Sequence, residues 1–300
     1  MEALEGRGKP MNEKPMNENP TQDNTVTITI VVDNQAQQGL ASEHGLALWI
    51  ETPDTCLLFD TAQGPAFEKN VASLKIPLEK ASAVILSHGH YDHTGGLPLA
   101  LARATKATLY CHPDATLKRY AIRDAKATDI SMPRAAQEAL LALPAERTSW
   151  TFGPMQLAPS LGILAGIPRK TTYEDTGGPF YLDPHGLEPD PLDDDLAVWI
   201  RTSRGLVVCL GCAHAGAINT LDFARLVTKE EKIHAVVGGL HLMEARKERL
   251  EQTIAALKNL NPELIVPCHC TGKAAVELLT QHLATAVQAG QAGQMHVFSG

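Results

Sequence analysis

One six-residue run constrains this chain more than any other feature. In His88-Gly89-His90-Tyr91-Asp92-His93, four side chains can bind a metal ion. The run follows the short apolar segment 83–86, which is typical of a buried strand, and loops at strand ends often carry function. In a tight turn, His88 and His90 point to one side while Asp92 and His93 point to another. The spacing therefore suits two adjacent metal ions, and imidazole with carboxylate favours zinc, manganese or iron over calcium or magnesium.

The order of apolar segments predicts the fold class. Strands are expected first, followed by strand–helix alternation, and this order occurs in both halves of the chain. Such an order favours an α/β fold with two mixed β-sheets packed face to face and helices outside. The pattern predicts strands at residues 25–32, 45–51, 56–60, 83–86, 107–110, 196–201, 206–210, 235–237, 264–266 and 296–298, and helices at 66–74, 96–104, 134–143, 218–227, 247–260 and 273–283.

Composition sets the domain organisation. Residues 1–24 are polar and are expected to form a disordered tail, which leaves 25–300 as a single domain. Residues 113–191 hold much of the proline and glycine, with weak strand signals at 155–157 and 162–167, and are expected to be an insertion over the core. A hydrophobic content of 44% excludes a mostly disordered chain.

Charge and hydropathy limit the classes of partner that the protein is expected to bind. The net charge of −8 argues against nucleic-acid binding through a broad basic face. No apolar run approaches the ~18 residues of a membrane span, and the N-terminus lacks the apolar stretch of a secretory signal peptide. The six cysteines are therefore expected to be reduced thiols of a cytoplasmic protein. The oligomeric state remains open.

Further metal ligands are expected at other strand ends. His214 and His269 each follow a predicted strand and precede a helix, which should bring them to the same sheet edge as His88. The pairs Cys209/Cys212 and Cys268/Cys270 have spacings that suit a four-cysteine zinc site. However, Cys268 and Cys270 flank His269 and would face away from it in extended backbone, and Cys209 lies inside an apolar strand. We interpret Cys209, Cys268 and Cys270 as core thiols.

Two groups of motifs carry a family resemblance. Residues 88–96 resemble the signature loop of the metallo-β-lactamase superfamily, and residues 57–61 are similar to its first motif. Segments 166–169, 210–216, 238–242 and 267–272 are similar to the branch often named 7,8-dihydropterin-6-yl-methyl-4-(β-D-ribofuranosyl)aminobenzene 5′-phosphate synthase. The resemblance covers roughly residues 25–300. It implies a four-layer αββα sandwich.

The same resemblance implies roles for individual residues. His88, His90 and His214 would hold one metal, and Asp92, His93 and His269 the other. Asp60 would be a buried group that orients the ligand loop. The family commonly has a histidine before this strand end and an Asp or Cys at the position of Cys212. This chain has no Gly-Asp at 211–212 and no histidine between residues 112 and 185. The bridge between the metals is therefore either the Cys212 thiolate or a water alone.

Residues outside the ligand set have weaker signals. His241, which ends a predicted strand, is a candidate proton donor, with a structural histidine as the alternative. Arg169 is a candidate contact for a phosphate or carboxylate, or else a solvated cation. The acidic run at 193–195 is expected to be a solvated or capping face, with Asp195 a secondary candidate near the ligands. Six histidines have no such context and are treated as background: His44, His112, His185, His234, His282 and His296.

The expected function follows from a dinuclear site. Two divalent ions, zinc above all and otherwise manganese or iron, activate water for attack on an ester, amide or phosphoester of a small anionic substrate. Asp92 and His241 are the expected catalytic residues. The alternatives are a pterin-linked synthase that transfers an alkyl group, and a metal-binding protein without catalysis. The di-iron redox relatives of this fold carry a flavin domain, for which 300 residues leave no room.

Overall fold

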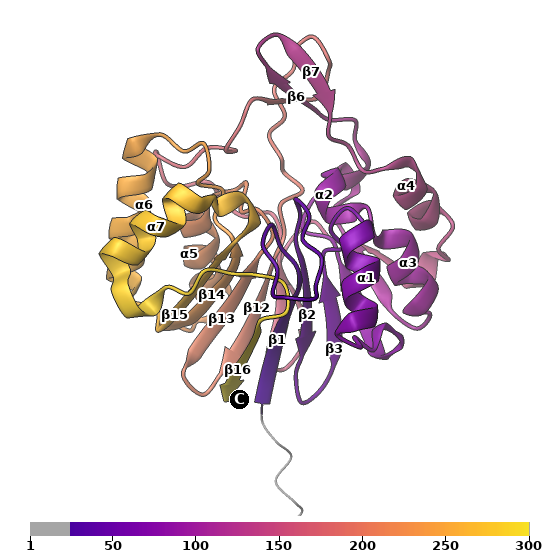
Figure 1. The fold of residues 1–300 in the computed structure, drawn as a ribbon, viewed down its shortest axis with the longest axis horizontal. Helices are drawn as coiled ribbons and strands as arrows, with labels where there is room; N and C mark the ends of the chain where they lie inside the picture. The colour runs from indigo at the N-terminus through magenta and orange to yellow at the C-terminus, as the bar shows by residue number, and fades with distance from the viewer. Residues whose placement is uncertain (1–24, 300) are drawn as a thin grey trace, which may run out of the picture.

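Two β-sheets lie face to face at the centre of the structure, a computed structural model that describes residues 25–299 (Figure 1). The predicted tail at 1–24 lies outside the described residues. The first sheet has the order β16 (Met295–Ser299), β1 (Thr25–Val32), β2 (Ala47–Glu51), β3 (Cys56–Phe59), β4 (Ala81–Ile85), β5 (Thr108–Cys111) and β8 (Thr148–Trp150). The second has the order β15 (Leu264–Cys268), β14 (Ile233–Gly239), β13 (Gly205–Leu210), β12 (Ala197–Thr202), β10 (Leu161–Leu164) and β9 (Met155–Ala158).

Helices cover the outer face of each sheet, as Figure 1 shows. The first sheet is covered by α1 (Pro65–Ser73), α3 (Leu97–Arg103) and α4 (Arg134–Leu141), and the second by α5 (Ala217–Thr228), α6 (Lys247–Leu260) and α7 (Lys273–Leu283). The short helix α2 (Tyr91–Thr94) lies within the predicted ligand loop. The predicted sandwich of two mixed sheets with helices outside is confirmed.

Three apolar layers hold these elements together, and strand β13 shows why. All six of its residues are buried, because both faces of the strand are covered. Val207 and Cys209 pack between the two sheets, whereas Leu206, Val208 and Leu210 pack against the helices of the second sheet. Because successive side chains of a strand point to opposite faces, β13 contributes residues to two apolar layers. The third layer lies between the first sheet and its helices.

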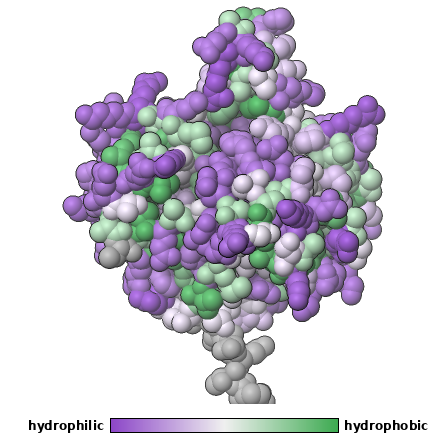
Figure 2. Space-filling view, in the orientation of Figure 1, coloured by the Kyte–Doolittle hydropathy of each residue, from purple (hydrophilic) through white to green (hydrophobic). Residues whose placement is uncertain are grey.

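The segment expected as an insertion at 113–191 needs a correction. Strands β8, β9 and β10 within it belong to the two main sheets. Only part of the segment stands apart, as a small three-stranded sheet of β11 (Phe180–Tyr181), β6 (Tyr120–Arg123) and β7 (Lys126–Asp129). The β6–β7 hairpin projects at the top of Figure 1, and in Figure 2 it carries both hydrophilic and apolar residues. These strands escaped prediction because their short, half-exposed sequences lack apolar alternation.

The candidate site lies at the carboxyl ends of the parallel strands. In the first sheet β3 pairs in parallel with β4, and in the second β13, β14 and β15 run parallel to one another. Their carboxyl ends lie at the same edge of each sheet, below the projecting hairpin. Every predicted ligand follows one of these strands. Among residues 25–299, no helix has both the length and the apolar character needed to span a membrane.

Candidate metal centre

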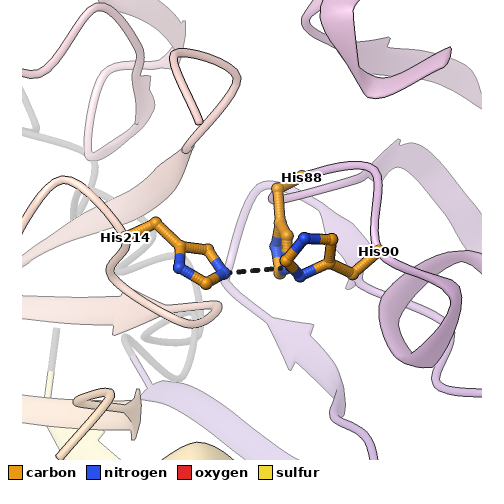
Figure 3. Close-up of side chains that lie close together, drawn as sticks. All are labelled: His88, His90 and His214. Atoms are coloured by element: carbon orange, nitrogen blue, oxygen red, sulfur yellow. Dashed lines mark hydrogen bonds between the residues drawn. The ribbon is translucent and has the colours of Figure 1, made fainter. Parts of the chain in front are cut away.

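The structure brings the predicted ligands of the first metal together. His88 Nε2 lies 3.0 Å from His90 Nδ1 and 3.3 Å from His214 Nε2 (Figure 3). His88 and His90 come from the loop after β4, and His214 from the loop after β13 on the opposite sheet. Nitrogen atoms bound to one tetrahedral zinc ion at 2.0–2.1 Å lie about 3.3 Å from one another. The two separations from His88 are close to that value, and the donor atoms of all three residues lie within 4.8 Å of one another.

The predicted ligands of the second metal are joined through His269. Its Nε2 lies 3.3 Å from His93 Nε2 and 3.3 Å from Asp92 Oδ2. Cys212 Sγ lies 3.1 Å from His93 Nε2. The thiol also lies within 4.8 Å of donor atoms of His88 and, in another cluster, of His214. Cys212 therefore sits between the two sets of ligands.

Oxygen acceptors orient most of these imidazoles. Four rings have Nδ1 within hydrogen-bond distance of an oxygen, so the proton on Nδ1 leaves a lone pair on Nε2. Metal-binding histidines are oriented in this way by a partner on the other nitrogen. The pairs are His88 with Ser87 Oγ at 2.8 Å, His93 with Asp60 Oδ2 at 2.7 Å, His214 with the carbonyl of Thr176 at 2.7 Å, and His269 with Asn34 Oδ1 at 2.9 Å.

Asp60 links two of these rings and anchors the ligand loop. Its Oδ1 accepts the backbone N–H of Ser87 at 2.7 Å, and its Oδ2 accepts the Ser87 hydroxyl at 2.6 Å. Because that hydroxyl donates to Asp60, its oxygen remains free to accept the N–H of His88. Asp60 is completely buried and has a left-handed φ of 61°. One carboxylate thus sets the orientation of both His93 and His88.

Burial keeps the first set of imidazoles neutral. It lowers the pKa of His88, His90 and His214 well below the ordinary value, and the neighbouring rings lower it further for His88 and His214. In His90 the nitrogen that faces His88 is Nδ1, at 3.0 Å, whereas its Nε2 is buried without a hydrogen-bond partner among the described residues. Neutral imidazoles with inward lone pairs are metal ligands. These residues therefore fit a divalent transition metal.

Asp92 has a neighbour that the sequence did not reveal. His44 Nε2 lies 3.1 Å from Asp92 Oδ2, so a histidine treated as background belongs to the site. Burial by itself would raise the pKa of Asp92. Hydrogen bonds from His269 and His44 outweigh that effect and hold the pKa well below its usual range. His44 was missed because it lies in an irregular segment before β2, with no strand end to mark it.

The other cysteines divide into two groups. Cys209 and Cys268 pack in the layer between the sheets, as expected of core thiols. Cys270 does not follow that expectation, because its Sγ lies in a cluster with Cys212 and His269. The backbone is not extended there: His269 has a left-handed φ of 46° and begins a turn. Burial raises the pKa of the Cys212 thiol, and a bound metal deprotonates such a thiol.

His241 lies beside the first set of ligands. It follows β14 with a left-handed φ of 47°, and its ring centroid lies 4.4 Å from that of His214. Its Nδ1 is buried without a hydrogen-bond partner among the described residues. Cys212, His214 and His241 also offer donor atoms within 4.8 Å of one another.

A cavity of about 140 Å³ opens onto these residues. The β6–β7 hairpin, the strand β11 and the loop after β14 all contribute residues to its lining. Asp92, His241 and His269 also line it. The surrounding residues include Ala121, Arg123, Ile130, Phe180, Met243 and Glu244.

The expectation for Arg169 requires a correction. Its guanidinium donates to the carbonyl oxygens of His214 at 2.9 Å and Leu192 at 3.0 Å, and also to that of Pro191. Arg169 is not one of the described residues that line the cavity. With its donors taken up by backbone oxygens, it supports the loop of His214 instead of presenting a charge to a substrate.

The acidic run at 193–195 is a solvated face only at Asp193, because Asp194 and Asp195 are buried. Asp195 lies near the ligands as expected, since its Oδ2 accepts the N–H of Ala215, beside His214, at 2.8 Å. Asp194 accepts the N–H of Gly89 at 2.8 Å, in the middle of the ligand loop. Its two oxygens also bind the fully buried Arg119 at 2.7 and 2.8 Å. Arg119 makes a further ion pair with Asp190 at 2.7 Å. No local sequence pattern marks an arginine whose partners lie more than 70 residues away, so Arg119 could not be predicted.

Comparisons with known proteins place these features in a family. A model described as the metallo-β-lactamase superfamily matches residues 43–269. A 7,8-dihydropterin-6-methyl-4-(β-D-ribofuranosyl)-aminobenzene-5′-phosphate synthase of Methanocaldococcus jannaschii is 30% identical over 241 residues, which cover 77% of this chain and 82% of the relative. An uncharacterized protein of the same organism is 27% identical over 260 residues, covering 85% and 94%.

Solved structures agree with this assignment. A crystal structure described as a metal-dependent hydrolase of the β-lactamase superfamily matches with a TM-score of 0.77 and 26% identity, over 92% of this chain and 100% of that one. The metallo-β-lactamase fold protein YhfI of Bacillus subtilis matches with a TM-score of 0.53 and 15% identity, over 91% and 99%, which shows the fold alone. The chain therefore belongs to the metallo-β-lactamase superfamily, in the branch that resembles the dihydropterin-ribofuranosylaminobenzene phosphate synthase.

Proposed function

We propose that this protein is a metal-dependent hydrolase that acts on an ester, amide or phosphoester of a small anionic molecule. The observation that carries the proposal is the convergence of inward-facing donor atoms from both sheets on one cavity. His88, His90 and His214 would hold one divalent ion, and Asp92, His93 and His269 the other. Cys212 would lie between them, and Asp60 would orient the loop.

The donor set supports zinc as the metal, with manganese or iron as the alternatives. When bound, two such ions lower the pKa of water and polarise the oxygen of the scissile group. Asp92 would accept a hydrogen bond from the attacking water and aim it, since this residue lines the cavity. His241 would deliver a proton from Nδ1 to the leaving group, because that nitrogen has no other partner among the described residues.

Arg123 is the cation in the cavity that favours our proposal of an anionic substrate. Its side chain lines the cavity and pairs with Glu244 across it at 2.9 Å. Both side chains are about half exposed, at 53% and 50%. An exposed ion pair of this kind contributes little to stability, so an incoming phosphate or carboxylate can replace Glu244 as the partner of Arg123. We propose that Arg123 takes the role that the sequence had suggested for Arg169.

A second candidate is a pterin-linked synthase that transfers an alkyl group, and the 30% identical relative favours it. A third, metal binding without catalysis, is opposed by the fact that every expected ligand is present. We further propose that the protein acts in the cytoplasm and without nucleic acid. All six cysteines are free thiols, which agrees with a reducing compartment.

The proposal is tested by metal content and by loss of activity together. Protein purified without added metal should contain up to two zinc ions per chain by mass spectrometry. It should hydrolyse nitrophenyl esters or phosphodiesters, and His88→Ala with Asp92→Ala should abolish that activity. The control His282→Ala, at an exposed position on α7, should change neither. Less than one bound metal per chain, or activity retained in the double variant, contradicts the proposal, and turnover of pterin substrates alone favours the synthase.

A further inference from the structure

Two of the six cysteines differ from the others in their surroundings. Cys111, Cys209 and Cys268 belong to the apolar layers, and Cys56 packs against one of them. Cys212 and Cys270 are just as buried, yet neither belongs to any apolar layer formed by residues 25–299. Both line the cavity instead. A buried thiol with no polar role packs as a small apolar side chain, so these two positions indicate another role.

The two thiols and His269 form one compact donor cluster. Sγ of Cys212, Sγ of Cys270 and a ring nitrogen of His269 all lie within 4.8 Å of one another. Sulfur atoms bound to a tetrahedral zinc ion at about 2.3 Å lie about 3.8 Å apart. A cluster of this size is compatible with one bound ion. His93 adjoins the cluster through its contact with Cys212 at 3.1 Å.

The backbone is built to turn Cys270 into the cavity. The left-handed φ of 46° at His269 ends the alternation of strand β15, so Cys268 and Cys270 have different environments. Cys268 Sγ lies 3.4 Å from the carbonyl oxygen of Val266, within the core. A Cβ at Gly239 would lie only 2.6 Å from Cys270 Sγ. The glycine at the end of β14 thus leaves the space that this thiol occupies.

We propose that Cys270 is a thiolate ligand of the metal centre, where it joins Cys212 and His269 in a sulfur-rich position. This inference rests on the metal centre of the proposed function but does not require hydrolytic activity. Each thiol loses its proton when it binds the ion. Two thiolates with imidazole select zinc or another thiophilic ion over manganese and magnesium. The assignment therefore also narrows the choice of metal.

Cobalt substitution tests the proposal without any measurement of turnover. The full chain is stripped with a chelator and reloaded with Co²⁺ under reducing, anaerobic conditions. The near-ultraviolet sulfur-to-cobalt charge-transfer band is then compared among single variants. Cys270→Ser and Cys212→Ser should each weaken the band by about twofold or more per bound cobalt. The matched control Cys268→Ser, two residues from Cys270 but in the core, should retain the full band.

Several outcomes overturn the inference. One is a wild-type protein with cobalt bound but no charge-transfer band. Another is a Cys270→Ser variant that keeps the full band while its circular dichroism and cobalt content match those of the wild type. If Cys270→Ser does not fold, X-ray absorption at the zinc edge of the wild type decides: two distinct cysteine sulfurs at about 2.3 Å support the proposal, and one contradicts it. Activity without a thiolate band would leave the hydrolase proposal standing while this inference fails.

Discussion

Asp60 Oδ2 lies 2.7 Å from His93 Nδ1, and both side chains are completely buried. The contact joins the end of β3 to the ligand loop after β4. Burial by itself would lower the pKa of His93, but the Asp60 charge and hydrogen bond outweigh it and raise the pKa. The carboxylate also fixes which nitrogen of His93 carries the proton. Asp60 therefore orients a proposed ligand, although it is not among the described residues that line the cavity.

We predict that Asp60→Asn weakens metal binding by about 10- to 100-fold, the usual effect of removing a partner that orients a ligand. An amide can donate to His93 Nδ1, which would move the proton to Nε2 and remove the lone pair. Chelator competition with zinc measures the affinity. The exposed Asp54→Asn serves as the control and should bind zinc like the wild type. Equal affinity in both variants would show that Asp60 has no orienting role.

Arg119 connects the β6–β7 hairpin to the ligand loop through Asp194. We predict that Arg119→Met lowers the free energy of unfolding by about 3–5 kcal/mol, because it leaves the buried charges of Asp190 and Asp194 without a partner. Urea unfolding of the metal-free protein measures the change. Arg134→Met, which breaks the exposed pair with Glu138, should have little effect. Comparable losses in the two variants would contradict this role for Arg119.

Arg123 and Glu244 should have opposite effects on an anionic substrate. Arg123→Gln removes the cation, so KM for a nitrophenyl phosphate should rise several-fold. Glu244→Gln removes the competing carboxylate, so the same KM should fall. A neutral nitrophenyl ester should be hydrolysed alike by all forms. Lys126→Gln, on the same hairpin, is the control for charge alone. Effects of the same sign at Arg123 and Glu244, or equal effects on the neutral ester, would exclude the proposed contact.

The elements and loops that depend on a local sequence pattern were predicted correctly. Strand β1 and helices α6 and α7 have the predicted bounds, because their apolar residues recur with a clear period over many positions. The loops that carry His88, His214 and His269 were found because each follows a short apolar strand. These features require no knowledge of which segments meet in space.

The surroundings of side chains whose partners are distant in the sequence could not be predicted from a local pattern. Asp194 is buried because Arg119 reaches it from 75 residues away, so an acidic run that resembles a surface segment became part of the core. Arg169 is occupied by backbone carbonyls that only the folded loops bring near it. Cys270 faces the cavity because one residue, His269, adopts a left-handed conformation that its sequence does not indicate.

His296 should contribute to acid sensitivity. Burial lowers its pKa, so below the unfolded value of about 6.5 the unfolded chain binds a proton that the folded chain does not. Stability is therefore lost as the pH falls through this range. His296→Gln should reduce the slope below about pH 6.5, by at most about 1.4 kcal/mol per pH unit. Urea midpoints of the metal-free protein measure it, with the exposed His185→Gln as control. Parallel curves for wild type and His296→Gln would contradict the prediction.

Gly177 lies directly against the ring of His241 at the cavity. A Cβ at Gly177 would lie 1.8 Å from Cδ2 of His241, and the backbone has a left-handed φ of 87°. Gly177→Ala must therefore displace the ring, and we predict that kcat falls by about 10²-fold, as it should in His241→Gln. The zinc content should stay unchanged, because neither change removes a residue of the two proposed ligand sets. Gly153→Ala is the control, since a Cβ there would meet no atom within 4 Å. If kcat in Gly177→Ala and His241→Gln equals that in Gly153→Ala, then His241 does not transfer the proton.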